Sequence, residues 1–197
     1  MGPGTYFQRL IIEGSRGDNM LTKSKKQGIK FADPMQIEKI IFCTGKIFYH
    51  LYHHRTAKLT KDNDSTQSSK IIIARLEQIA PFPYDLISPF VERYPNARLI
   101  WVQEEPKNMG AWGYIKPRFD TLLRDIEAIS GHKRVIKFYT MTVIYIFKLL
   151  TCHLNLLYSI IQNLIDYIGR NPSASPATGS YKTHGIEQSE ILEKAIS

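Results

Sequence analysis

Three short apolar runs, each followed by a segment of helical character, constrain the fold of this chain more than any other feature. The runs occupy residues 38–43, 71–73 and 98–102. Runs this short with so few polar residues are typical of strands that are covered on both faces. Such strands need helices on either side of their sheet, so we expect a layered α/β domain.

The segments outside these runs predict helices. After the first run, residues 46–58 carry apolar side chains at i, i+1, i+4 and i+5 from Ile47, which is the spacing of one helix face. Near the end of the chain, residues 186–196 predict a final amphipathic helix that packs back on the domain.

Two further helices are expected around prolines. Ser88 and Pro89 form an N-cap and first-helical-position pair, which predicts a short helix that ends near residues 94–95. Residues 111–124 predict a helix that bends or restarts at Pro117, because proline cannot donate to the helical hydrogen-bond ladder.

Strand–helix units in this order predict a mainly parallel sheet with helices on both faces. The chain has 197 residues, a length that suits one core plus appendages. Residues 7–12 form a short apolar patch and residues 14–28 are polar and rich in glycine, serine and lysine. We therefore predict a lead-in segment over residues 1–35, loose over residues 14–28, and an α/β domain over residues 36–197.

Composition excludes several classes of partner and site. The formal net charge is +8, but the densest lysine cluster has no interleaved aromatic residues for stacking on bases. That cluster comprises Lys23, Lys25, Lys26 and Lys30. The two cysteines, Cys43 and Cys152, each lie in an apolar run, so neither a disulfide framework nor a cysteine metal site is expected. We expect no nucleic-acid partner.

No cofactor, metal or targeting signal is expected from local motifs. His50, His53 and His54 have a spacing that can bind metal, but no carboxylate or cysteine lies near them in sequence, so a solvated helix face is the better interpretation. Residues 17–19 are Gly-Asp-Asn, so the glycine that ends the Gly-Asp-Gly motif of thiamine diphosphate sites is absent. The first residues show no transit peptide.

The strongest local motif is residues 103–112, directly after the third apolar run. In α/β sheets the carboxyl ends of strands face the binding crevice, so Glu104 and Glu105 are candidate ligands, interface anchors or acid–base groups. The alternative is structural: the two carboxylates cap backbone amides or pair with Lys107 in an ordered turn. No self-contained catalytic set of residues is found along the chain.

Six segments, taken in order, resemble the C-terminal domain of the first, thiamine-dependent and decarboxylating component of 2-oxoglutarate dehydrogenase. They are residues 3–9 (PGTYFQR), 42–49 (FCTGKIFY), 75–83 (RLEQIAPFP), 94–97 (YPNA), 103–112 (QEEPKNMGAW) and 173–179 (SASPATG) with 182–184 (KTH). The sister enzyme that acts on 2-oxoadipate shares part of the fifth segment, whereas the fourth and sixth favour the 2-oxoglutarate branch.

The resemblance implies a three-layer α/β sandwich like the C-terminal domain of transketolases, which helps to form the dimer. It implies that the whole enzyme works in the mitochondrial matrix with the other subunits of its complex. Thiamine diphosphate and magnesium would be bound by upstream domains, so this chain would hold no catalytic residue and no cofactor. Gln103, Glu104, Glu105, Asn108 and Gly110 would then form a turn with a structural, interface or regulatory role. The competing hypothesis is a non-catalytic binding module that uses Glu104, Glu105 and Asn108.

An anomalous apolar insertion is expected at about residues 135–166. Of the 29 residues from 137 to 165, 21 are Phe, Tyr, Ile, Lys, Asn, Met or Leu, and none is Gly, Ala, Pro, Arg, Asp or Glu. AT-rich codons favour those seven types, which suggests translated non-coding DNA such as a retained intron.

Two other origins of this block are open. It could be an apolar helix inserted in the domain, or a membrane helix, since its length suffices to cross a ~30 Å hydrocarbon core. Lys148, His153 and Asn155 disfavour a membrane span, because a central lysine alone costs about 3 kcal/mol on insertion. A membrane is therefore not expected as a partner.

Overall fold

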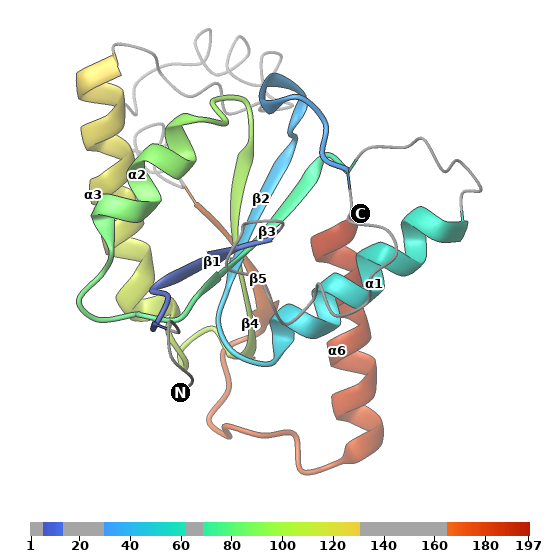
Figure 1. Ribbon diagram of the computed structural model, residues 1–197. Coiled ribbons are helices and arrows are strands. Elements are labelled where there is room, and N and C mark those ends of the chain that lie inside the picture. The colour runs from blue at the N-terminus through green and yellow to red at the C-terminus, as the bar shows by residue number, and fades with distance from the viewer. Residues whose placement is uncertain (1–5, 14–29, 62–68, 131–164) are drawn as a thin grey trace, which may run out of the picture.

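The computed structural model describes residues 6–13, 30–61, 69–130 and 165–197, which form one five-stranded sheet and the helices around it (Figure 1). The strands are β1 (Leu10–Ile12), β2 (Lys39–Cys43), β3 (Ile71–Leu76), β4 (Arg98–Pro106) and β5 (Asp166–Arg170). The α-helices are α1 (Ile47–Lys61), α2 (Tyr84–Glu92), α3 (Trp112–Ser130) and α6 (Tyr181–Ile196), and a short 3-10 helix spans Pro34–Gln36.

The sheet has the order β1-β3-β2-β4-β5, and only β1 runs antiparallel to its neighbour. In the centre, Ile40 of β2 lies between Ile72 of β3 and Leu99 of β4. Branched apolar residues suit this position, because side chains on both faces of a central strand are buried.

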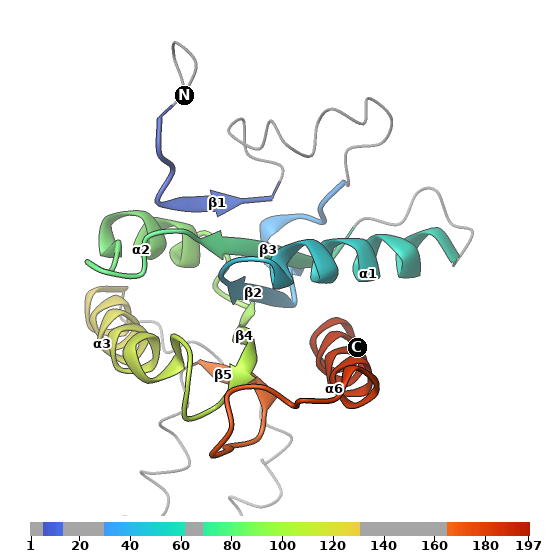
Figure 2. The ribbon, with the colours of Figure 1, turned by 90° about the horizontal axis from the view of Figure 1, so that it is seen from below.

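The helices cover both faces of the sheet, as Figure 2 shows end-on: α1 and α6 lie on one side and α2 and α3 on the other. Alternation along the strands separates the two cores. Phe42 and Trp101 pack toward α2 and α3, whereas Ile41 and Ile100 pack toward α1 and α6. The predicted three-layer sandwich with a mainly parallel sheet is therefore confirmed.

Residues 10–12, within the predicted lead-in segment, form β1 at the edge of the sheet. A buried ion pair holds this strand end in place: Glu13 accepts hydrogen bonds from both terminal nitrogens of Arg55 on α1, at 2.6 Å from Nη1. Arg55 Nη1 also donates to the carbonyl of Ile71 at 3.1 Å. The carboxylate and guanidinium lie 42 residues apart, so local sequence patterns could not reveal them.

The predicted helix start at Pro89 is wrong, and so is a restart at Pro117, whereas a bend at Pro117 stays a prediction. Pro89 lies inside α2 and does not start it, because α2 begins at Tyr84 and buries Ile87, Phe90 and Val91 against the core. Pro117 likewise lies inside α3, which is one continuous helix. In both helices the apolar face continues through the proline, and its burial outweighs the one hydrogen bond that proline cannot donate.

The C-terminal helix begins five residues earlier than expected, at Tyr181, with Ser180 as its N-cap. The predicted apolar block lies outside the described residues, apart from its end. Ile165 is 1% exposed and belongs to the core, and Asp166 begins β5, so these two residues are part of the domain. Among the described residues, no helix is both long and apolar enough to cross a membrane.

Candidate functional site

The predicted motif forms the end of β4 and the turn into α3, at the carboxyl edge of the parallel sheet. The pairing of β4 with β5 is irregular here: Val102 lies opposite Ile168, but the next pair is Pro106 with Arg170. Three residues of β4 therefore lie opposite Gly169 alone. Such bulges re-aim side chains beside functional sites.

Gly169 is the residue that permits this close approach. A Cβ atom at this position would lie 2.9 Å from the carbonyl oxygen of Gln103 and 2.7 Å from Cζ of Tyr167. Both distances are too short for non-bonded heavy atoms, so glycine is required for the bulge and for the position of the Tyr167 ring.

Gln103 holds the turn together from inside. Its side chain is buried, and its oxygen accepts hydrogen bonds from the indole of Trp101 at 2.9 Å and from the backbone amide of Trp112 at 3.1 Å. Its amide nitrogen lies within 3.2 Å of three backbone carbonyls, those of Glu105, Pro106 and Met109. One side chain thus satisfies polar groups of the strand, the turn and the start of α3.

Gly110 completes this packing. Its φ is 65°, a left-handed conformation that only glycine adopts readily. A Cβ atom here would lie 3.0 Å from Nε2 of Gln103 and 3.1 Å from Cβ of Glu105. The motif therefore needs glycine for two reasons, backbone conformation and space.

Asn108 joins the turn to the segment that follows β5. Its side-chain nitrogen donates to the carbonyl of Ser173 at 2.9 Å, and its oxygen accepts from the amide of Ser173 at 3.0 Å. This two-way pairing resembles one rung of a sheet and fixes the start of the connector to α6.

The two carboxylates of the motif point away from this network. Glu104 accepts a hydrogen bond from Gln188 of α6 at 3.1 Å, and Glu105 is exposed. Lys107 lies over the ring of Tyr167, with Nζ 5.5 Å from the ring centroid. The turn is thus ordered, as the structural interpretation expects, but its order comes from Gln103 and Asn108 rather than from the carboxylates.

A pocket of about 380 Å³ opens beside these carboxylates. It is lined by Glu104, Glu105, Arg170, the connector residues 176–180, and Tyr181 and His184 of α6. The guanidinium of Arg170 is committed to other groups, because Nε lies 2.8 Å from Glu187 and Nη1 donates to the carbonyl of Pro176. The free charge at the mouth of the pocket is therefore negative.

Tyr167 closes the inner side of the turn. Its hydroxyl lies 3.0 Å from the carbonyl oxygen of Arg170 and 3.2 Å from that of Glu105, and its ring packs against Trp112 at a centroid distance of 5.0 Å. Burial of this hydroxyl raises the pKa of Tyr167 to about 12. Tyr167 is thus a neutral hydrogen-bond donor at physiological pH.

Other candidates from the sequence are not brought together in the structure. The imidazole of His54 lies 3.0 Å from Glu193 of α6, and His53 contacts the ring of Tyr52. Within residues 6–13, 30–61, 69–130 and 165–197, no three His, Cys, Asp or Glu side chains gather in a possible metal site. Cys43 is fully buried, and burial raises the pKa of its thiol, which opposes a nucleophilic role.

Comparison with known proteins agrees with this architecture. The family described as 2-oxoglutarate dehydrogenase C-terminal matches residues 1–140. The chain belongs to this family. It is 35% identical over 197 residues to the rat protein "2-oxoglutarate dehydrogenase-like, mitochondrial" and 33% identical over 193 residues to the Caenorhabditis elegans protein "2-oxoglutarate dehydrogenase, mitochondrial". These matches cover 100% and 98% of the chain.

The resemblance seen in the sequence is therefore confirmed: this is a 2-oxoglutarate dehydrogenase C-terminal domain. It spans only 14% of the rat protein and 13% of the nematode protein. The site residues that sequence reasoning missed are Tyr167, Ser173 and Arg170. Each contacts the motif from more than 60 positions away; Ser173 begins the sixth segment of the resemblance, but no local pattern indicates its contact with Asn108.

Proposed function

We propose that this domain is a structural part of a thiamine-dependent 2-oxoglutarate dehydrogenase that works in the mitochondrial matrix. In this role it supports the dimer and the contacts with the other subunits of the complex, and the catalytic centre lies in other domains. The family membership supports the reaction, and the names of the relatives, which include "mitochondrial", support the compartment.

One observation carries the structural role. The amide side chains of the motif are engaged within the domain: the buried Gln103 binds the backbone from Glu105 to Trp112, and the exposed Asn108 binds Ser173. A catalytic site keeps donors or acceptors directed at a substrate, whereas here they stabilise a turn and a connector.

The donor set also supports placing the cofactor elsewhere. Magnesium prefers several oxygen ligands in octahedral geometry, and the phosphate oxygens of thiamine diphosphate would coordinate that ion. At this edge of the sheet Glu104 contacts Gln188 and Arg170 is paired with Glu187. These residues do not form the oxygen cage that the ion needs.

The test is a decarboxylation assay. The 197-residue chain is incubated with 2-oxoglutarate, thiamine diphosphate and magnesium, and carbon dioxide is measured against a full-length 2-oxoglutarate dehydrogenase as positive control. We expect no release above the rate without protein. Release by the chain itself would contradict the proposal. In the full-length enzyme that carries this domain, a higher kcat/KM for 2-oxoadipate than for 2-oxoglutarate would assign it to the sister branch.

The pocket beside Glu105 favours a second candidate function, that of a binding module. Two carboxylates face this pocket, and its one arginine is paired with Glu187, so a basic group of a partner fits better than an anion. Replacement of Glu105 by Lys should then weaken subunit binding in the complex without a change in the melting temperature. Unchanged binding would exclude this function.

A further inference from the structure

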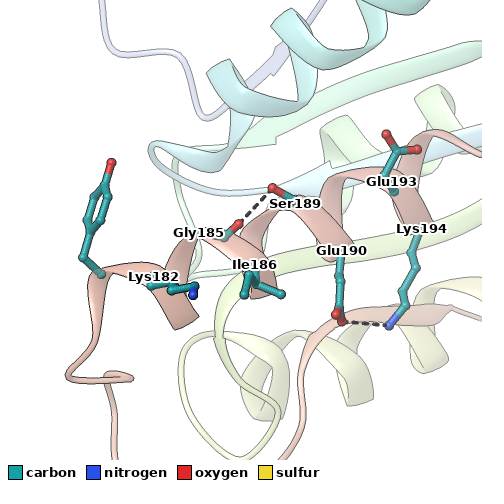
Figure 3. A pocket seen from close by; sticks show the side chains of 8 residues that line it. Lys182, Gly185, Ile186, Ser189, Glu190, Glu193 and Lys194 are labelled. Carbon is teal, nitrogen blue, oxygen red and sulfur yellow. Dashed lines mark hydrogen bonds and ion pairs between the residues drawn. The ribbon is translucent and has the colours of Figure 1, made fainter.

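One face of α6 is turned to solvent and carries an unusual mixture of apolar and charged side chains. The four residues Lys182, Ile186, Glu190 and Lys194 recur at every fourth position and lie along one side of the helix (Figure 3). We call them the outer row of α6. Ile186 is 53% exposed, and Tyr181 at the start of the helix is 93% exposed. A hollow of about 620 Å³ runs beside this face.

The opposite face of the same helix accounts for its attachment to the domain. Ile191, Ala195 and Ile196 are buried against the sheet and α1. The outer row is therefore not needed to hold α6 in place. An apolar residue flanked by charged ones has the arrangement of the centre and rim of a contact surface.

The charges of the outer row identify the partner that fits it. If a second copy of α6 lies antiparallel across a two-fold axis at Ile186, each residue 186+n faces the partner residue 186−n. Ile186 then meets its own copy, and Lys182 meets Glu190 twice, once on each side of the axis.

A shifted register of the same two helices brings like charges together. With the axis moved by half a turn, to residue 188, Lys182 would face Lys194. In the favoured register Glu190 lies between its own Lys194, at 3.8 Å, and the partner subunit's Lys182. Charge complementarity therefore favours the register centred on Ile186 over the one centred on residue 188.

Small residues beside the row allow the helices to approach. Gly185 has open space around it, since a Cβ atom added there would meet nothing within 4 Å. Ser189 lies on the same side as Gly185, and its hydroxyl donates to the carbonyl of Gly185 at 2.8 Å. This hydroxyl proton therefore needs no acceptor on a second helix. We propose that the outer row of α6 is a self-complementary interface, which binds the outer row of a second copy of this chain in antiparallel orientation.

The size of the surface sets the expected affinity. A helix of 16 residues is roughly 24 Å long, and one pair of such helices buries less than the ~1,200 Å² of a standard stable interface. We expect the isolated chain to dimerise weakly, on the order of micromolar to hundreds of micromolar, and the contact to strengthen a dimer that other domains also hold.

The test is sedimentation equilibrium of the full 197-residue chain at low salt, where exposed ion pairs are least screened. Five proteins are compared: the native chain, K182E, E190K, the double variant K182E/E190K, and K46E, a control that makes the charge change of K182E on an exposed loop residue. Circular dichroism checks that each variant is folded, which we expect because both side chains are exposed.

We expect each single variant on α6 to weaken dimerisation by about tenfold or more, since two attractive pairs become two repulsive ones. The double variant should restore the native dissociation constant to within about threefold, and K46E should leave it unchanged. A native chain that stays monomeric up to about 500 µM, or a double variant that stays as weak as the single ones, would overturn the interface. This inference deepens the proposed structural role, but carbon dioxide release by the chain would overturn that role and leave the interface untouched.

Discussion

The side-chain oxygen of Gln103 accepts a hydrogen bond from the backbone amide of Trp112 at 3.1 Å. Through this bond the last fully buried polar residue of β4 binds the first residue of α3, nine positions along the chain. The amide of a first helical residue lacks a partner within its own helix, so Gln103 acts as a distant helix cap. This hydrogen bond thus helps to set the direction of α3 relative to the sheet.

This relationship predicts a large loss of stability when Gln103 is replaced by Met, which has a similar shape but no polar atoms. The substitution leaves the Trp101 indole, the Trp112 amide and three carbonyls without their partner. We expect the free energy of unfolding to fall by about 3 kcal/mol in urea denaturation, because each unsatisfied buried group costs ~1–3 kcal/mol. Gln188→Met, which removes one partly exposed hydrogen bond, should cost less than about 1 kcal/mol. Equal losses would contradict the capping role.

Two nearby glycines should respond to alanine in opposite directions. Gly110→Ala forces a left-handed backbone on alanine and brings its Cβ to 3.0 Å from Gln103, so we expect a loss of about 1–2 kcal/mol. Gly113 lies in α3 with open space around it, and Gly113→Ala should stabilise the helix by about 0.5–1 kcal/mol. Thermal unfolding measures both, and a neutral Gly110→Ala would mean that the turn can rearrange.

The raised pKa of Tyr167 predicts a specific dependence of stability on pH. The folded protein keeps the phenolic proton up to about pH 12, whereas the unfolded chain loses it near its ordinary pKa of 10.0. The stabilising contribution is therefore complete below pH 10 and is lost as the pH rises from 10 to 12. The difference in stability between the native chain and Tyr167→Phe should shrink over this window. In absorbance titrations, the native chain should show one more high-pH tyrosine than the variant, and its absence would contradict the burial of this hydroxyl.

Removal of residues 137–164 should leave the domain folded. The deletion keeps Ile165 in the core and keeps the ion pair between Arg98 and Asp166, whose Nε and Oδ2 lie 2.5 Å apart, so β5 retains its contacts. We expect the variant to melt at the same or a higher temperature and to be more soluble, because the deleted block is strongly apolar. Sequenced transcripts should include a form without this block. Unfolding of the variant would show that the block is a structural element.

The sequence predicted the central strands well because their signal is local. Ile40, Ile72 and Leu99 lie in short apolar runs, and burial on both faces of a sheet requires that composition. The same logic failed for β1, whose three residues are too few to show a pattern and whose place depends on pairing with β3, more than 60 residues away.

Only the part of the candidate site that lies within the motif, residues 103–112, could be predicted from the sequence. Gln103, Asn108 and Gly110 are neighbours in sequence, so the motif was visible and an ordered turn could be expected. The residues that complete it, Tyr167 and Ser173, are brought in by the pairing of β4 with β5. That pairing is a property of the fold, which local spacing does not encode.

The most direct test of the structural role concerns the two carboxylates in a full-length 2-oxoglutarate dehydrogenase that carries this domain. Glu104 contacts α6 through Gln188 and Glu105 faces solvent, so neither is directed at a reacting group within the domain. With both replaced by glutamine, we expect kcat within about twofold of the native enzyme and any change to appear first as a lower melting temperature or a weaker dimer. An unchanged melting temperature together with a large fall in kcat would place the carboxylates in catalysis and contradict this account.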